Sequence, residues 1–237
     1  MKTARVAVPL LALIAIVLLL ISGPGVHLGW WTFVTGFKLL EWAAYAGLAA
    51  AGLGIIALVV PATRHGFSAW LTVSIIVSLV VAWVPWHWAQ RARSVPAIHD
   101  ISTNTANPPQ FVAVLPLRKD APNSPIYGGS SVAAQQHAAY PDIKPLHLNL
   151  PPAQVFRRAL DAAKAMGWKV VAVVPAVGRI EATATTGWFG FKDDIVVRVR
   201  TEGSDSVVDV RSQSRVGRSD IGTNAARVRN YLRKLAG

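Results

Sequence analysis

Three long apolar stretches decide the fold of this chain. Residues 6–21 read VAVPLLALIAIVLLLI, residues 39–60 read LLEWAAYAGLAAAGLGIIALVV, and residues 67–88 read FSAWLTVSIIVSLVVAWVPWHW. At a rise of about 1.5 Å per residue, each is about long enough as a helix to cross a hydrocarbon core of ~30 Å. The sequence therefore predicts a three-helix transmembrane anchor over residues 1–89.

The first stretch has a second interpretation, because it follows Lys2 and Arg5 as the apolar part of a secretory signal peptide would. However, the next residues, from Ser22 to Gly25, do not form a cleavage site of small residues, and two further spans follow. These features favour a membrane span over a cleaved leader.

The middle stretch carries small residues at helical spacing, with Ala43, Gly47 and Ala51 on one face. Small residues at this spacing let helix backbones approach closely in lipid. The pattern predicts close helix packing, and an oligomer formed through the Gly47 face is one form that it can take. No charged residue lies near the middle of a span, which argues against a transport pathway.

The charged flanks favour a cytoplasmic amino terminus. Lys2 and Arg5 precede the first span, and Arg64 lies in the short loop between the second and third spans. Three spans would then place the remaining chain on the far side. We therefore predict a multi-pass protein of the inner (cytoplasmic) membrane whose carboxy-terminal domain is extracytoplasmic.

The residues that follow the anchor are basic. The chain has 24 Lys and Arg against 12 Asp and Glu, which gives a net charge of +12. The predicted partners are the lipid bilayer and, for this basic part, an anionic lipid or an envelope protein. Nucleic acid is not expected at an extracytoplasmic site. Cysteine is absent, which excludes disulfides and thiol chemistry, and the histidine spacing matches no metal site. No cofactor motif is found.

Residues 90–150 are rich in proline, which prevents long helices. We expect an extended segment that wraps the soluble part or links it to the anchor, with a short strand over residues 111–117 and a short helix over residues 131–139.

Residues 151–237 show regular periodicity. A helical stripe from Val155 to Met166 is followed by four stretches with strand character, at residues 168–174, 179–186, 195–200 and 208–211. A last amphipathic segment, with Ile221, Ala225 and Val228 on its apolar face, follows a capping Ser219 or Asp220. This order predicts an α+β core, an antiparallel sheet of about four strands covered on one face by two helices.

A polar string links the last strand to the last helix. It reads RSQSRVGRSDIGTN over residues 211–224, and the acidic pair Asp193-Asp194 precedes it. The string resembles the bacterial and plastid family of domains of unknown function numbered 1499, and the resemblance extends over roughly residues 96–235. Many members of that family open with a Cys-Pro…Asn-Cys segment, whereas this chain has His99-Asp100-Ile101-Ser102. The resemblance implies the fold and no activity.

The string offers two interpretations. Guanidinium groups beside free N–H groups at a helix start would make an anion or partner site. Alternatively, Asp220 is a helix cap and the arginines pair with carboxylates as internal braces. Asp193 and Asp194 are neighbours in a predicted strand, so they should point to opposite faces and make a poor acid/base couple. The residues predicted for a ligand or partner site are Asp193, Asp194, Arg211, Ser212, Ser214, Arg215, Ser219, Asp220, Asn224 and Arg227.

No catalytic residue is predicted, because the sequence has no nucleophile elbow, phosphate loop or dinucleotide fingerprint. The sequence favours a membrane-anchored, extracytoplasmic binding or assembly module of the cell envelope. The alternative is an enzyme that acts on an envelope substrate at the Asp193/Arg211/Arg215 region.

Overall fold

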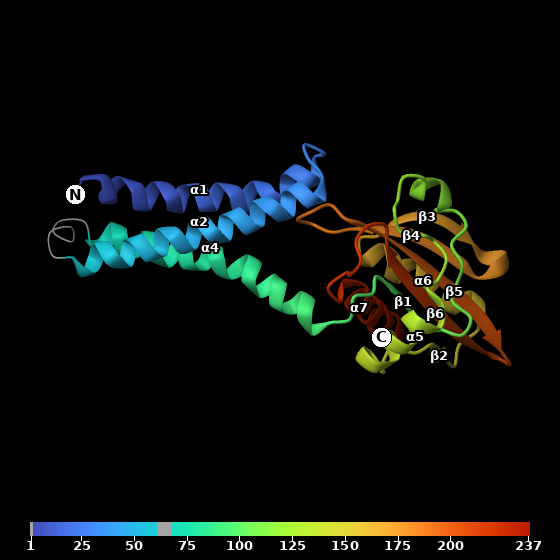
Figure 1. Cartoon of the computed structure of the whole chain (residues 1–237). Helices are drawn as coiled ribbons and strands as arrows, with labels where there is room; N and C mark the ends of the chain where they lie inside the picture. The colour runs from blue at the N-terminus through green and yellow to red at the C-terminus, as the bar shows by residue number, and fades with distance from the viewer. Residues whose placement is uncertain (1, 61–67) are drawn as a thin grey trace. The chain divides into compact units, whose positions relative to one another are not determined.

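The computed structural model describes residues 2–60 and 68–237, which form two compact units (Figure 1). The helical unit comprises Met1–Arg91 and the turn Gly187–Gly190, and the sheet unit comprises Ala92–Thr186 and Phe191–Gly237.

The helical unit is built from α1 (Lys2–His27), α2 (Phe33–Val59) and α4 (Ser68–Ser94). All three contain a stretch long and apolar enough to cross a membrane: Val6–His27, Phe33–Val59 and Ala69–Ser94. The predicted three-helix anchor is therefore confirmed, and the chain is a membrane-anchored protein. The loop with Arg64 lies outside the described residues.

The small-residue face of α2 packs inside the anchor. A side chain at Gly47 would place its Cβ 2.7 Å from the carbonyl oxygen of Ser78, and one at Gly54 would meet Ile75 at 2.6 Å. A Cβ at Gly36 would likewise lie 2.7 Å from the carbonyl oxygen of Ser22. The three glycines thus let α1 and α4 approach the α2 backbone. Association of copies through the Gly47 face remains a prediction.

We expect Gly47→Leu to lower the stability of the anchor by about 1–3 kcal/mol, because the new side chain collides with the backbone of α4. The measurement is the thermal unfolding midpoint of the full-length protein in a mild detergent. Gly52→Leu is the matched control, because a Cβ at Gly52 meets nothing within 4 Å. Equal midpoints for the two variants would contradict close packing at Gly47.

The sheet unit contains a larger set of shorter elements. In chain order they are β1 (Asp100–Ser102), η1 (Leu115–Arg118), α5 (Gly129–Ala139), β2 (Leu146–Leu148), α6 (Pro152–Ala165), β3 (Lys169–Val174), η2 (Pro175–Val177), β4 (Arg179–Thr185), β5 (Lys192–Glu202), β6 (Asp205–Ser214) and α7 (Thr223–Ala236).

The strands form one antiparallel sheet in the order β1-β6-β5-β4-β3, and β2 also pairs with β6. The four predicted strands are its β3–β6 meander. The other two strands, β1 and β2, were not predicted. Strand β1 pairs with one end of β6, at Arg211–Gln213, and β2 pairs with the other end, at Ser206–Val208. Each has only three residues, too few to show a strand pattern in the sequence. The predicted class is confirmed, with six strands in place of about four.

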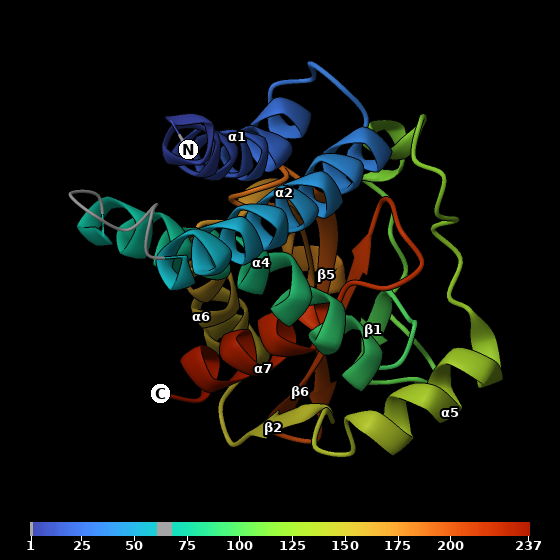
Figure 2. The same ribbon diagram turned by 60° about the vertical axis from the view of Figure 1, so that its left-hand side comes forward.

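Both predicted helices cover the same face of the sheet (Figure 2). Val155 and Ala159 of α6, Val228 and Tyr231 of α7, and Ile195 of β5 belong to one buried apolar cluster. Pro152 stands in the first turn of α6, as expected. Helix α7 begins at Thr223, two residues after Ile221, which the sequence had placed on the apolar face of that helix.

The other face of the sheet is covered by an irregular segment, residues 103–127, which we call the strap. The strand predicted at residues 111–117 is wrong, because this part of the strap has no strand and ends in the 3-10 helix η1. The backbone N–H groups of Val112, Ala113 and Val114 all donate to the Glu181 carboxylate, each at 3.0 Å. Successive amides of a strand point in opposite directions and cannot meet one acceptor.

Candidate functional site

Sheet geometry separates the two neighbouring aspartates of the predicted site. Asp193 lies on the face covered by the helices, where it pairs with Arg227 of α7. Asp194 lies on the face covered by the strap, where it pairs with Arg118 of η1. The alternation of a β-strand dictates this result. The two carboxylates are therefore not an acid/base couple.

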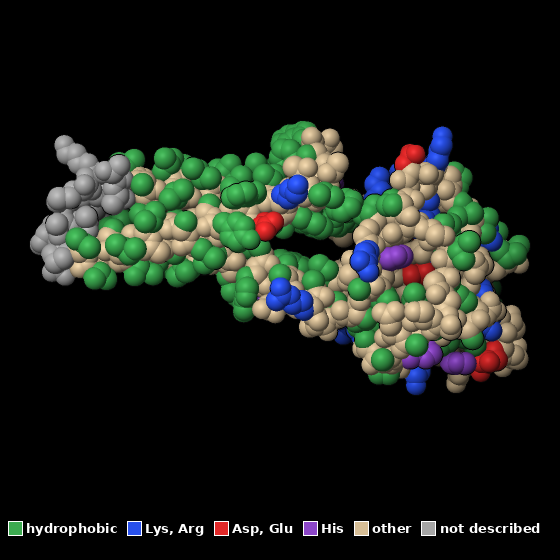
Figure 3. All heavy atoms as spheres, in the orientation of Figure 1, with side chains coloured by type: hydrophobic (Ala, Val, Ile, Leu, Met, Phe, Trp, Pro, Cys, Tyr) green, Lys and Arg blue, Asp and Glu red, His purple; other side chains and the backbone are tan. Residues whose placement is uncertain are grey.

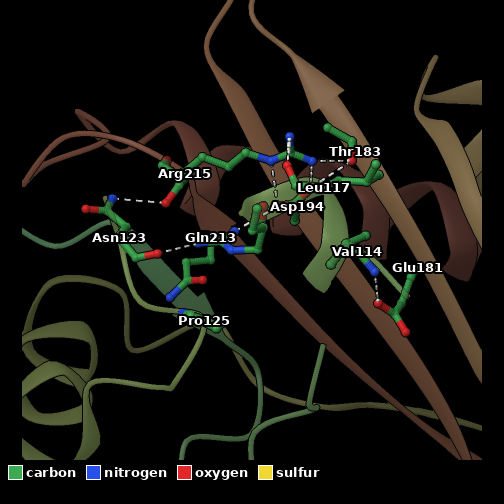
Figure 4. A network of polar contacts seen from close by, with 12 residues as sticks. Val114, Leu117, Asn123, Pro125, Glu181, Thr183, Asp194, Gln213 and Arg215 are labelled. Carbon is green, nitrogen blue, oxygen red and sulfur yellow. Dashed lines mark hydrogen bonds and ion pairs between the residues drawn. The ribbon is translucent and has the colours of Figure 1, made fainter. Parts of the chain in front are cut away.

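Asp194 is the centre of a buried ion cluster (Figure 4). Arg215 donates to both of its carboxylate oxygens, from Nη2 at 2.8 Å and from Nε at 2.9 Å. Arg118 donates from Nη1 at 2.8 Å, and the Thr183 hydroxyl at 2.7 Å. Asp194 is 0% exposed, so hydrogen bonds from two guanidinium groups and a hydroxyl replace those that water would make to its carboxylate. Burial lowers the pKa of Arg118 from its ordinary value, an effect that the contact with Asp194 partly offsets.

Arg211 forms a second buried cluster next to the first. It donates to both oxygens of Asp100, from Nε at 2.9 Å and from Nη2 at 2.7 Å. Gln213 donates to the same carboxylate at 2.9 Å. The guanidinium also bonds carbonyl oxygens of the strap and lies over the ring of Phe111, 4.7 Å from its centroid. Arg211 thus holds β1, β6 and the strap together.

Two further carboxylates on this face also lie beside arginines. Glu181 is fully buried, binds three backbone amides of the strap, and lies 2.9 Å from Arg179. Asp209 accepts hydrogen bonds from Arg198 and Arg200. Glu181 and Thr183 alternate with the apolar residues of β4 and so form its polar side, but the strap buries both side chains.

On the helix face, the predicted residues form a hydrogen-bond chain. Arg227 donates to Asp193 at 2.6 Å and to Ser212 at 3.1 Å, and also donates to Asn224. The Ser212 hydroxyl donates to Asn224 Oδ1 at 2.6 Å. Asn224 in turn donates to Ser214 at 2.9 Å. The chain ties the first turn of α7 to β5 and β6.

The start of α7 is satisfied by the protein's own carboxylate. Asp220 accepts the backbone N–H of Asn224 and that of Gly222, both at 2.8 Å. Ser219 accepts the N–H of Ile221 at 3.2 Å. Burial raises the pKa of Asp220 from its ordinary value. The N-cap residue of α7 is Gly222, which has no side chain that could cap the helix, so the cap predicted at Ser219 or Asp220 is not the one observed. Asp220 lies two residues before the N-cap and accepts the two N–H groups from there.

The predicted residues are therefore divided among three places. Asp194, Arg211 and Arg215 lie under the strap, Ser219 and Asp220 lie before α7, and the rest form the helix-face chain. Ligand or partner binding by these residues remains a prediction. Five strap-side partners of these clusters were not predicted from the sequence: Asp100, Arg118, Glu181, Thr183 and Asp209. Within the described residues, no three His, Asp or Glu side chains are grouped to hold a metal ion.

A family model described as "Protein of unknown function (DUF1499)" matches residues 100–235, from the first strand to the last helix of the sheet unit. A comparison with curated proteins found no match.

Proposed function

This chain belongs to the DUF1499 family and carries a three-helix membrane anchor, and we propose that it is a membrane-anchored binding or assembly module of the cell envelope. In this proposal the anchor lies in the inner membrane and the sheet unit lies outside the cytoplasm. The charged amino-terminal flank and the odd number of spans support that orientation.

The observation that carries the proposal is the pairing of the buried carboxylates. Asp100, Glu181, Asp193, Asp194 and Asp209 are each 2% exposed or less, and each has an arginine partner. A general acid or base must contact substrate and exchange a proton with it. Carboxylates held in buried ion pairs are suited to bracing a fold, so this arrangement favours binding or assembly over catalysis.

The enzyme alternative is not supported by the placement of its residues. Asp193 lies on the helix face of the sheet, whereas Arg211 and Arg215 lie under the strap on the other face. These three side chains do not converge on one substrate position.

The strap offers a surface for a protein partner. Its apolar side chains Val112, Leu115, Leu117 and Ile126 are between 41% and 76% exposed. Because Glu181, Arg211 and Arg215 bond the strap backbone, these side chains are held on a fixed support. Exposed apolar groups on a braced segment suit contact with another envelope protein.

We expect cysteines placed on the strap to be reached from outside the cytoplasm and to crosslink a partner. The natural chain has no cysteine, so Leu117→Cys or Ile126→Cys creates a single reactive thiol. A maleimide that cannot cross the inner membrane should label both variants in intact cells. If the cells have an outer membrane, it is first made permeable to the reagent. A photo-crosslinker attached to the same thiol should then give an adduct larger than the chain.

The matched control is Val114→Cys, because Val114 is fully buried in the same strap and should react only after unfolding. Labelling of the exposed cysteines only after cell lysis would place the sheet unit in the cytoplasm. Absence of any adduct from either exposed position would argue against a partner on the strap.

A further inference from the structure

One face of α2 carries a polar and aromatic stripe on an otherwise apolar surface. Lys38, Glu41, Trp42 and Tyr45 follow the spacing i, i+3, i+4, i+7, which places them on the same side of the helix. All four side chains are exposed. The surface of the helical unit is mostly hydrophobic, with isolated basic and acidic side chains (Figure 3). Exposed polar groups on a membrane helix need a partner in or beside the lipid.

Within the part of the chain that the structure describes, Glu41 has one hydrogen-bond partner, the neutral Tyr45, and no ion-pair partner. It is the only acidic residue in the first 89 residues of the sequence. The Tyr45 hydroxyl donates to Glu41 Oε1 at 2.9 Å. The rings of Trp42 and Tyr45 pack edge to face, with their centroids 6.0 Å apart. Among the described residues, no basic side chain forms an ion pair with Glu41, and no acidic one with Lys38. The stripe thus carries a carboxylate and an ammonium that form no ion pair with any described residue.

The stripe lies at the depth of the membrane interface. A Cβ at Gly54 would meet Ile75 and one at Gly47 would meet Ala82, so α2 and α4 are antiparallel. The residues before Gly47 and those after Ala82 therefore lie toward the same end of the helical unit, although the two helices diverge there (Figure 1). This part of α4 holds Trp83 and Trp86, both more than half exposed. Exposed tryptophans mark the headgroup region, and about 27 Å of helix separates Trp42 from Val60, close to the thickness of the hydrocarbon core.

We propose that this stripe binds the headgroup of a phospholipid that ends in a primary ammonium, of which phosphatidylethanolamine is the probe. Lys38 contacts the phosphate, and Glu41 accepts a hydrogen bond from the ammonium beside the rings of Trp42 and Tyr45. The two opposite charges of the stripe match the two opposite charges of the headgroup. A primary ammonium carries the N–H donors that a carboxylate needs, whereas choline has none. The proposal holds for either orientation of the protein.

The test is lipid retention by the full-length protein, measured by native mass spectrometry in a mild detergent. Phosphatidylethanolamine, phosphatidylcholine and phosphatidylglycerol with the same acyl chains are added separately. We expect phosphatidylethanolamine to be retained most strongly. Glu41→Gln should weaken its retention by about tenfold, the effect of one charge-assisted hydrogen bond, and leave phosphatidylglycerol unchanged. Lys38→Gln should weaken both lipids, since both have a phosphate.

Trp42→Leu and Trp70→Leu form a matched pair, because both tryptophans are exposed on membrane helices and only Trp42 adjoins an acid. Only the first should weaken phosphatidylethanolamine retention. The proposal would be overturned if the natural protein retained all three lipids equally, or retained phosphatidylethanolamine and phosphatidylcholine equally. It would also be overturned if Glu41→Gln retained phosphatidylethanolamine as strongly as the natural protein does. Circular dichroism of each variant checks that the helices remain folded.

Discussion

Arg211→Ala is expected to destabilise the sheet unit by about 3–5 kcal/mol, the cost of leaving one member of a buried ion pair without its partner. Arg211 is 0% exposed, and its loss leaves Asp100 buried with Gln213 as its one remaining side-chain donor among the described residues. Two strap carbonyls, of Pro109 and Pro125, lose their donor in the same variant. Because the free energy of unfolding of a domain is typically 5–15 kcal/mol, this is a large part of the total.

The measurement is urea unfolding of the full-length protein in a fixed mild detergent, followed by pulse proteolysis of the unfolded fraction. Arg229→Ala is the control, because the Arg229–Asp142 pair is exposed, at 38% and 54%, and should contribute about 0–1 kcal/mol. Arg211→Lys keeps the charge but loses the paired donors, so its loss of unfolding free energy should lie between those of Arg211→Ala and Arg229→Ala. Equal midpoints for Arg211→Ala and Arg229→Ala would show that Arg211 does not brace the fold.

The sequence predicted those parts of the fold that depend on local periodicity. The apolar runs that become α1, α2 and α4 contain few charges. The alternation in β4–β6 and the apolar stripe of α6 identify which side chains face the core, and β3 was predicted from a continuous apolar run. The opposite placement of Asp193 and Asp194 follows from the same alternation. Periodicity was sufficient here because each pattern is set by the geometry of one element.

The strap-side clusters could not be predicted in this way, since their partners are distant in the sequence. Arg118 and Asp194 are 76 positions apart, and Arg211 and Asp100 are 111 positions apart. Alternation marks Glu181, Thr183 and Asp194 as one polar face, and a polar face of a sheet is ordinarily solvated. Only the strap, which has no regular periodicity, turns that face into a buried one. Arg215 pairs with Asp194, as the brace interpretation of the string expects of its arginines.

Asp194→Ala is expected to cost about as much as Arg211→Ala, about 3–5 kcal/mol, because it leaves two guanidinium groups without their carboxylate. Arg118 and Arg215 have side chains only 2% and 13% exposed, so water cannot replace the lost partner well. Arg215→Ala should cost less, about 1–3 kcal/mol, because Asp194 keeps its bonds to Arg118 and Thr183.

A double variant separates the ion cluster from a binding site. If the damage in Asp194→Ala comes from the uncompensated charge of Arg118, then adding Arg118→Met should recover part of the lost stability, since a buried ion pair can be replaced by apolar groups at little cost. The same urea and proteolysis measurement gives the coupling free energy between the two positions. If Asp194 instead serves a partner, Asp194→Ala should unfold like the natural protein and lose the crosslinked adduct on the strap. We expect the loss of stability and its partial recovery, because every oxygen of the Asp194 carboxylate is already bonded inside the domain.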